Sequence, residues 1–331
     1  MTILVLDGGL LTTVQDLGRN GSQKFGVIVS GAMDTYSTRI ANLLVGNQQD
    51  EAVLEITLVG TKLEFEKDTV ISLTGADLQA KLNEETIAMW RPVTVKKGDI
   101  LTCGFAIEGC RAYLALAGGV DVPVVMGSKS TYMAAGIGGF EGRPLQQGDC
   151  VSTGSCQTDT EEMINRIIHR STPATWSVPA SSLIKLHKNQ TIRFLRGSEY
   201  DAFAEESRKA FITESYTLTP QSNRMGVRLE GPPVQLKEKL ELLSEGVTYG
   251  TIQIPPNGKP IVLMADRQTT GGYPKIGQVI TADLSSLAQC KPGDSVQFIE
   301  VTLEDAEAEL LRKEKLIEEI QIGIKQKMLD T

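Results

Sequence analysis

The sequence predicts a mainly β protein with short helices, made of two modules in tandem and followed by a C-terminal helix. Short apolar segments, partly alternating with polar residues, recur between turns rich in Gly, Asp, Asn or Pro. The clearest of them lie at 53–56, 70–73, 93–95 and 113–117. In three places a Gly-Asp turn launches such a segment, which suggests that one β-rich module occurs twice. These turns are at 98–99, 148–149 and 293–294.

The first module begins with a predicted strand at 3–6, followed by a polar segment at 11–21. Gln15, Asp16 and Arg19 stand there among glycines, a composition that suits either a binding loop or a solvated turn. A short helix is predicted at 35–44. Asp34 can cap its N-terminus, and capping alone would explain that residue.

A segment rich in turn formers, 157–190, separates the two modules and contains a short predicted helix at its start. The predicted domains are a first module at 1–156, the linker at 157–190, a second module at 191–302 and the helix at 303–331.

The second module begins with a predicted strand, a helical segment and another strand. These elements are expected at 191–195, 199–210 and 214–218. A polar cluster follows, in which Arg224 is either a ligand contact or a brace on the loop. After a buried strand at 260–265 the chain turns polar again, which fits a binding loop or a plain hairpin turn.

Leu303–Met328 carries apolar residues at helical spacing with a charged opposite face. We expect this helix to pack on its own chain, and a contact with a partner is the alternative.

Composition narrows the function classes. Of the 331 residues 41% are hydrophobic and 22% charged, with a net charge of −8, which argues against nucleic acid or an anionic membrane as the main partner. No segment resembles a signal peptide or spans a bilayer, so we expect a cytoplasmic protein. The five cysteines are scattered and odd in number, which favours reduced, mostly buried thiols. Two histidines, His169 and His187, cannot form a two-histidine metal motif, and no metal site is expected.

Two glycine-containing segments resemble nucleotide sites without matching them. Segment 127–131, Gly-Ser-Lys-Ser-Thr, lacks the spacing of a phosphate-binding loop. Segment 135–143 has Glu141 where a dinucleotide fingerprint requires its third glycine. We therefore predict no self-sufficient nucleotide site in this chain.

Five segments in order resemble the biotin-dependent carboxyltransferase family, also described as allophanate hydrolase subunit 2, and within it the KipA type. They are 12–19 (TTVQDLGR), 30–34 (SGAMD), 41–47 (ANLLVGN), 222–226 (SNRMG) and 268–274 (QTTGGYP). The resemblance implies two cyclophilin-like β-barrel modules, in agreement with the strand-rich halves.

The same resemblance implies an activity and partners. It indicates the C subunit of an ATP-dependent 5-oxoprolinase, which acts with a KipI-like B subunit and with an A subunit, and ATP is the co-substrate of the complex. One alternative is a regulatory protein that antagonises a KipI-type histidine-kinase inhibitor. Another is the carboxyltransferase component of a biotin-dependent urea or amide carboxylase, with biotin carried on another protein because this chain has no Met-Lys-Met motif.

We predict one cleft that joins the polar clusters of both modules. Asp16 or Asp34 could serve as general base, and Arg224 could hold a carboxylate or phosphate in a bidentate fork. Capping or loop bracing would explain the two aspartates equally well. Amide side chains could read the N–H and C=O of a lactam. The predicted substrate-binding residues are Gln15, Arg19, Asn223, Gln268, Thr270, Gly271, Gly272 and Tyr273.

Overall fold

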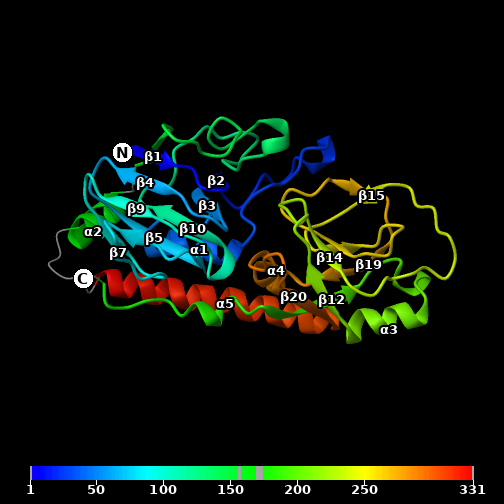
Figure 1. Cartoon of the computed structure of the whole chain (residues 1–331). Coiled ribbons are helices and arrows are strands. Elements are labelled where there is room, and N and C mark those ends of the chain that lie inside the picture. Colours follow the sequence, from blue (N-terminus) through cyan, green and yellow to red (C-terminus); the bar gives the residue numbers. More distant parts are fainter. Residues whose placement is uncertain (1, 156–157, 169–173, 330–331) are drawn as a thin grey trace. The chain divides into compact units, whose positions relative to one another are not determined.

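The computed structural model describes residues 2–155, 158–168 and 174–329 (Figure 1). His169, Cys156 and part of the predicted linker lie outside the described residues. The chain divides into two compact units. The first unit comprises Met1–Asn20, Ser30–Ile184 and Lys315–Thr331, and the second comprises Gly21–Val29 and Lys185–Glu314. The four-part division predicted from the sequence stays a prediction.

The first unit contains a six-stranded and a five-stranded sheet. The six-stranded sheet has the order β11 (Cys150–Ser152), β1 (Thr2–Asp7), β4 (Lys62–Phe65), β9 (Ile100–Thr102), β6 (Lys81–Leu82) and β7 (Glu85–Thr86). The five-stranded sheet has the order β2 (Thr12–Gln15), β3 (Val53–Thr57), β10 (Glu108–Leu116), β5 (Thr69–Asp77) and β8 (Val93–Val95). Apolar side chains from both sheets, such as Phe65 and Leu114, share one buried cluster. The hydrophobic core of this unit therefore lies between the sheets.

Helix α1 (Thr35–Leu44) covers the other face of the five-stranded sheet. Ser72 and Thr74 of β5 donate hydrogen bonds to α1 carbonyl oxygens of Ala41 and Ser37, at 2.6 and 2.8 Å. Because both faces are covered, β5 is buried from Thr69 to Ala76. The helix has the predicted bounds, and α2 (Thr158–Ile168) forms close to where the second short helix was expected.

The second unit is a closed barrel of seven strands. Around the barrel they are β12 (Asn189–Arg196), β19 (Lys275–Val279), β16 (Thr251–Gln253), β17 (Ile261–Leu263), β14 (Gly226–Glu230), β13 (Ser215–Leu218) and β20 (Ser295–Glu300). Neighbouring strands are antiparallel except β12 and β20, which are parallel. A separate ribbon pairs β15 (Glu245–Gly246) with β18 (Thr270–Gly271).

Aromatic rings fill part of this second core. Phe211, from α3 (Glu205–Thr213), stacks on Phe298 of β20 with ring centroids 4.5 Å apart. Phe194 of β12 meets Phe211 edge-on at 5.3 Å. Gly277 of β19 lies so close to Phe194 that a Cβ there would be 2.4 Å from the ring, so no larger residue fits. Helix α3 begins later than the predicted start at 199, because Phe203 has an extended backbone.

Helix α5 (Leu303–Leu329) confirms the predicted C-terminal helix. Its N-terminus is capped by Thr302, whose hydroxyl accepts from the Asp305 N–H at 3.2 Å. Ile317, Ile324 and Met328 are buried, as expected of a helix that packs on its own chain. Leu303, counted on the apolar face from spacing, is exposed at the first turn of the helix.

The described chain is mainly β with few helices, as the sequence predicts. Within the described residues, Cys103, Cys110, Cys150 and Cys290 form no disulfide, and all of them are buried except Cys150, which is exposed. Within the described ranges no helix is long and apolar enough to cross a membrane. Those ranges also contain no group of three or more His, Cys, Asp or Glu residues that could hold a metal ion.

Candidate functional site

The predicted site residues of the first unit lie where β2 ends, and Asp16 is bound to a distant loop. Its carboxylate accepts hydrogen bonds from the Ser128 hydroxyl at 2.7 Å and from the Lys129 N–H at 2.6 Å, and a further one from the Ser130 hydroxyl. The carboxylate also accepts from the Gly18 N–H at 2.8 Å, the Asp16 N–H donates to Ser130 Oγ at 3.0 Å, and the Asp16 carbonyl accepts from the Ala32 N–H at 2.8 Å. Asp16 therefore positions the loop.

Arg19 holds the same loop from its other end. Its Nε donates to the Val125 carbonyl and its Nη2 to the Ser130 carbonyl, both at 2.9 Å. The side chain is completely buried. Gly138 makes room for it, since a Cβ at that position would lie 2.7 Å from Nη2 and 2.1 Å from the Ser130 oxygen. Segment 125–130 is thus fixed by one buried anion and one buried cation.

This loop contains the segment that resembles the end of a phosphate-binding loop. Two serine hydroxyls and one backbone N–H are donors that would suit a phosphate. They are already taken by the carboxylate of Asp16. The loop therefore does not fit a phosphate group in this conformation, and we assign it no role in holding ATP.

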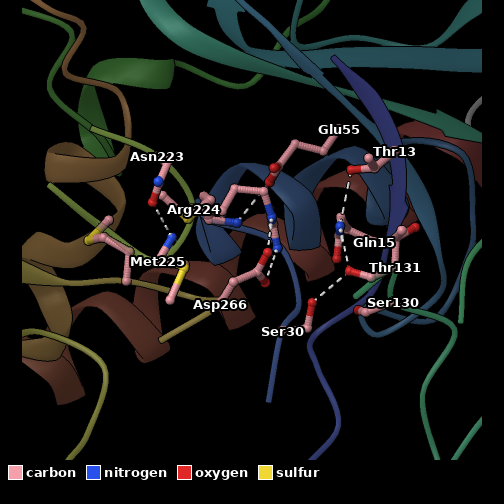
Figure 2. Close-up of polar contacts among 12 residues, drawn as sticks. Thr13, Gln15, Ser30, Glu55, Ser130, Thr131, Asn223, Arg224, Met225 and Asp266 are labelled. Atoms are coloured by element: carbon pink, nitrogen blue, oxygen red, sulfur yellow. Dashed lines mark hydrogen bonds and ion pairs between the residues drawn. The ribbon is translucent and has the colours of Figure 1, made fainter. Parts of the chain in front are cut away.

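Gln15 lies beside this loop and is also completely buried (Figure 2). Its Nε2 donates to Thr13 Oγ1 at 3.0 Å and to the Thr131 carbonyl at 3.4 Å. The Thr131 carbonyl also accepts from the Ser30 hydroxyl at 2.8 Å. The Oε1 atom of Gln15 is buried and has no hydrogen-bond partner within the described residues. Such an acceptor is costly to leave unmatched.

Asp34 caps helix α1, as the sequence suggested. Its carboxylate accepts from the N–H of Ser37 at 2.9 Å and from the Ser37 hydroxyl at 2.5 Å. Its own N–H donates to the Tyr113 hydroxyl at 2.8 Å, and that hydroxyl donates to Glu55 Oε2 at 2.9 Å. Met33 N–H also donates to Glu55 Oε2, at 2.8 Å. Burial, followed by the nearby Glu55 carboxylate, raises the pKa of Tyr113 well above its ordinary value, so this phenol stays protonated.

In the second unit, Arg224 forms a buried bidentate ion pair with Asp266 (Figure 2). Nε and Nη2 donate to the two carboxylate oxygens at 2.9 and 3.0 Å. The backbones are joined too, because the Asp266 N–H donates to the Arg224 carbonyl at 2.8 Å. The preceding residue, Asn223, closes the turn by accepting from the N–H of Met225 at 2.8 Å and of Gly226 at 3.3 Å. The brace proposed for Arg224 is therefore present.

The last predicted group lies on the ribbon of β15 and β18. Gln268 is exposed and forms no hydrogen bond within the part of the chain that the structure describes. Thr270 and Gly271 form β18 itself. Gly271 packs against the buried Gln253, since a Cβ at 271 would be 2.4 Å from the Gln253 amide nitrogen.

Gly272 and Tyr273 line a cavity of about 720 Å³. Its walls come from three segments of the second unit, 233–242, 254–258 and 272–274. Tyr273 is half exposed there, at 46%. Asn223, Arg224, Gln268 and Thr270 are not among the residues that line it.

Within each unit the structure brings only some of the predicted residues together. The first unit joins Asp16 and Arg19 through one loop, and the second joins Gly272 and Tyr273 at one cavity. A single cleft that unites the residues of both units stays a prediction.

Sequence reasoning missed several polar partners. Ser130 and Asp266 were not selected, although each binds a residue that was. Glu55 and Tyr113 were missed as well. A signal for Glu55 was available, because it is one carboxylate within the apolar strand Val53–Thr57.

Comparisons with known proteins agree with the family resemblance of the five signature segments. A family model described as carboxyltransferase domain, subdomain A and B, matches residues 25–300. The chain is 43% identical over 303 residues to the 5-oxoprolinase C subunit of Escherichia coli, covering 91% of this chain and 92% of that protein. It is 40% identical over 313 residues to the 5-oxoprolinase C subunit of Haemophilus influenzae, covering 94% and 95%.

Among solved structures, the urea amidolyase of K. lactis superposes with a TM-score of 0.86 at 34% identity. The match covers 96% of this chain but 20% of that much longer one. The mainly β fold, the order of the signature segments and the family match over 25–300 lead to one conclusion: the chain belongs to the family of carboxyltransferase domains with subdomains A and B.

Proposed function

We propose that this chain is the C subunit of an ATP-dependent 5-oxoprolinase, and that it acts in the cytoplasm with the KipI-like B subunit and the A subunit. The observation that carries the proposal is identity of 43% and 40%, over nearly the full length of both chains, to two proteins named as the C subunit of 5-oxoprolinase. The urea amidolyase of Lachancea kluyveri is less similar, at 34% identity, and the match covers 18% of it.

The reaction needs activation of its substrate. A five-membered lactam such as 5-oxo-L-proline is a poor electrophile. Transfer of the γ-phosphoryl group of ATP to the amide oxygen would make that oxygen a leaving group. Addition of water and cleavage of the C–N bond would then yield L-glutamate, ADP and phosphate.

The contacts of the two aspartates support a binding role for this chain. Asp16 and Asp34, the candidate general bases, are each held by hydrogen bonds to their own chain. Arg224 is likewise held by Asp266. Gln268 has an exposed amide that could pair with both the N–H and the C=O of a lactam. We therefore assign proton transfer and phosphoryl transfer to the other subunits.

Reconstitution tests this function directly. The purified chain alone is expected to form no glutamate from 5-oxoproline and to hydrolyse no ATP, because its phosphate-like loop is filled by Asp16. Once the two other subunits are added, glutamate and ADP should appear in equal amounts. Glutamate production by the single chain would contradict this division of roles.

A second candidate is carboxyl transfer from carboxybiotin on another protein to urea or a related amide. The TM-score of 0.86 to the K. lactis urea amidolyase favours it. The same reconstituted complex distinguishes the two: transfer of labelled carboxyl from carboxybiotin to urea, without ATP-dependent glutamate formation, would select this candidate. If the chain instead antagonises a KipI-type kinase inhibitor, its only measurable activity would be binding to the KipI-like B subunit.

A further inference from the structure

Three large apolar side chains of the first unit extend into solvent at one place. Leu10, Phe105 and Ile107 are 60%, 69% and 59% exposed. Isolated exposed leucines are ordinary on a protein surface, but a contiguous group of large apolar residues is characteristic of an interaction surface. We call these three residues the Phe105 patch.

Backbone hydrogen bonds hold the segments of the patch side by side. The Leu10 N–H donates to the Val59 carbonyl at 3.1 Å, and Val59 pairs with Phe105 in an antiparallel bridge. The Ala106 N–H donates to the Leu58 carbonyl at 2.8 Å. The arrangement requires Leu58 to adopt a left-handed backbone with φ of 59°. The patch is therefore organised in advance, which lowers the entropy lost on binding.

Two carboxylates flank the patch in an unusual arrangement. Glu108, next to Ile107, lies directly opposite Asp77 where β10 pairs with β5. Like charges opposite each other on neighbouring strands destabilise a sheet. Neither carboxylate forms an ion pair within the described part of the chain. A cation placed between them would relieve the repulsion.

We propose that the Phe105 patch docks a partner protein whose surface offers an apolar pocket beside a lysine or arginine side chain. In the complex, Phe105 fills the pocket and the basic side chain lies between Asp77 and Glu108. An anionic lipid surface would meet these carboxylates with repulsion, and a second copy of this chain offers a patch flanked by the same two carboxylates. The inference rests on the proposed function in one respect, since it takes the partner to be the KipI-like B subunit.

Phe105→Glu tests the apolar part of the surface. The matched control is Ile322→Glu on helix α5, because Ile322 is 70% exposed in the same unit but lies outside the patch. Both proteins are checked for unchanged circular dichroism and titrated by calorimetry into the KipI-like B subunit. Phe105→Glu should weaken binding at least tenfold, and Ile322→Glu should bind as the wild type does.

Glu108→Lys tests the charged part, with the exposed Glu66→Lys as its control. Glu108→Lys should lower the affinity for the KipI-like B subunit, with a smaller salt dependence, while Glu66→Lys should change neither. Wild-type affinity in Phe105→Glu, or an equal loss in Phe105→Glu and Ile322→Glu, overturns the docking surface and leaves the proposed function intact. If the wild-type chain does not bind the KipI-like B subunit, the assigned partner is wrong and the docking proposal falls with it.

Discussion

At the residue scale, Asp16 links β2 to a loop more than a hundred positions away in sequence. Replacement by Asn puts an amide N–H₂ or a weaker acceptor opposite the Ser128 and Ser130 hydroxyls and the Lys129 N–H. Asp16→Asn should therefore lower the free energy of unfolding by about 1–3 kcal/mol, the cost of poorly satisfied buried polar groups.

The same variant should raise the rate of amide hydrogen exchange within 125–131. That readout separates positioning from catalysis. If Asp16 were the general base, activity of the complex would fall about 10²–10⁴-fold while protection of the loop stayed as in the wild type. The urea unfolding midpoint and exchange by mass spectrometry are the two measurements.

Gln268 differs from Asp16 because its side chain forms no hydrogen bond within the described residues. Gln268→Ala should leave the urea midpoint unchanged. In the reconstituted complex it should lower glutamate formation about 10²–10³-fold if its amide binds the lactam in the transition state, the loss seen when one such donor is removed. A loss under about threefold, with normal assembly, would remove Gln268 from the substrate site.

At the element scale, an ion pair between Glu309 and Arg193 joins helix α5 to strand β12. Hydrogen bonding to Arg312, and then to Arg193, lowers the pKa of Glu309 to about 2. Because the folded-state pKa is depressed, the stabilisation is present above the ordinary pKa near 4.5 and is lost as pH falls through about 2.

Glu309→Gln should accordingly make the protein less stable at pH 7 and flatten the decline of stability between pH 4.5 and 2. Thermal unfolding over that range measures the effect. Glu205→Gln is the control, because its ion pair with Lys209 is exposed and within one helix. Parallel pH profiles for wild type and Glu309→Gln would show that this contact does not anchor the helix.

Signals carried by a few adjacent residues allowed helices α1 and α5 to be predicted. Asp34 and the apolar residues of 35–44 specify α1, and the spacing in 303–328 specifies α5. Periodicity also placed strands such as β13 and β17. Pairings between distant residues could not be predicted in this way. The contact of Asp16 with Ser130 joins positions 114 residues apart, and nothing local in either segment encodes it.

The candidate site illustrates the same difference. Composition selected Arg19 and Arg224 as candidate site residues, and both are buried. Whether a buried arginine meets a ligand or its own chain depends on partners such as Asp266, which only the fold brings near. The ribbon of β15 and β18 was likewise unpredictable, because its two-residue strands are too short for periodicity.

At the scale of the whole molecule, we predict a stable heteromer with the KipI-like B subunit, in which each chain is present twice. The proteins should co-elute in size-exclusion chromatography at micromolar concentration, with a mass by light scattering that fits four chains. The chain alone, assayed at the same concentration, is the control for self-association. Separate elution of the two proteins would contradict the prediction.

The division of α5 between the units affects how the protein is made. The first unit includes residues 315–331, where Ile317, Ile324 and Met328 are buried. A ribosome reaches those residues only after it has synthesised the barrel of the second unit. At about 5–20 residues per second, the earlier strands wait for many seconds without their last packing partner. The first unit is therefore the last to complete its packing, and its nascent strands are the ones that need protection from aggregation.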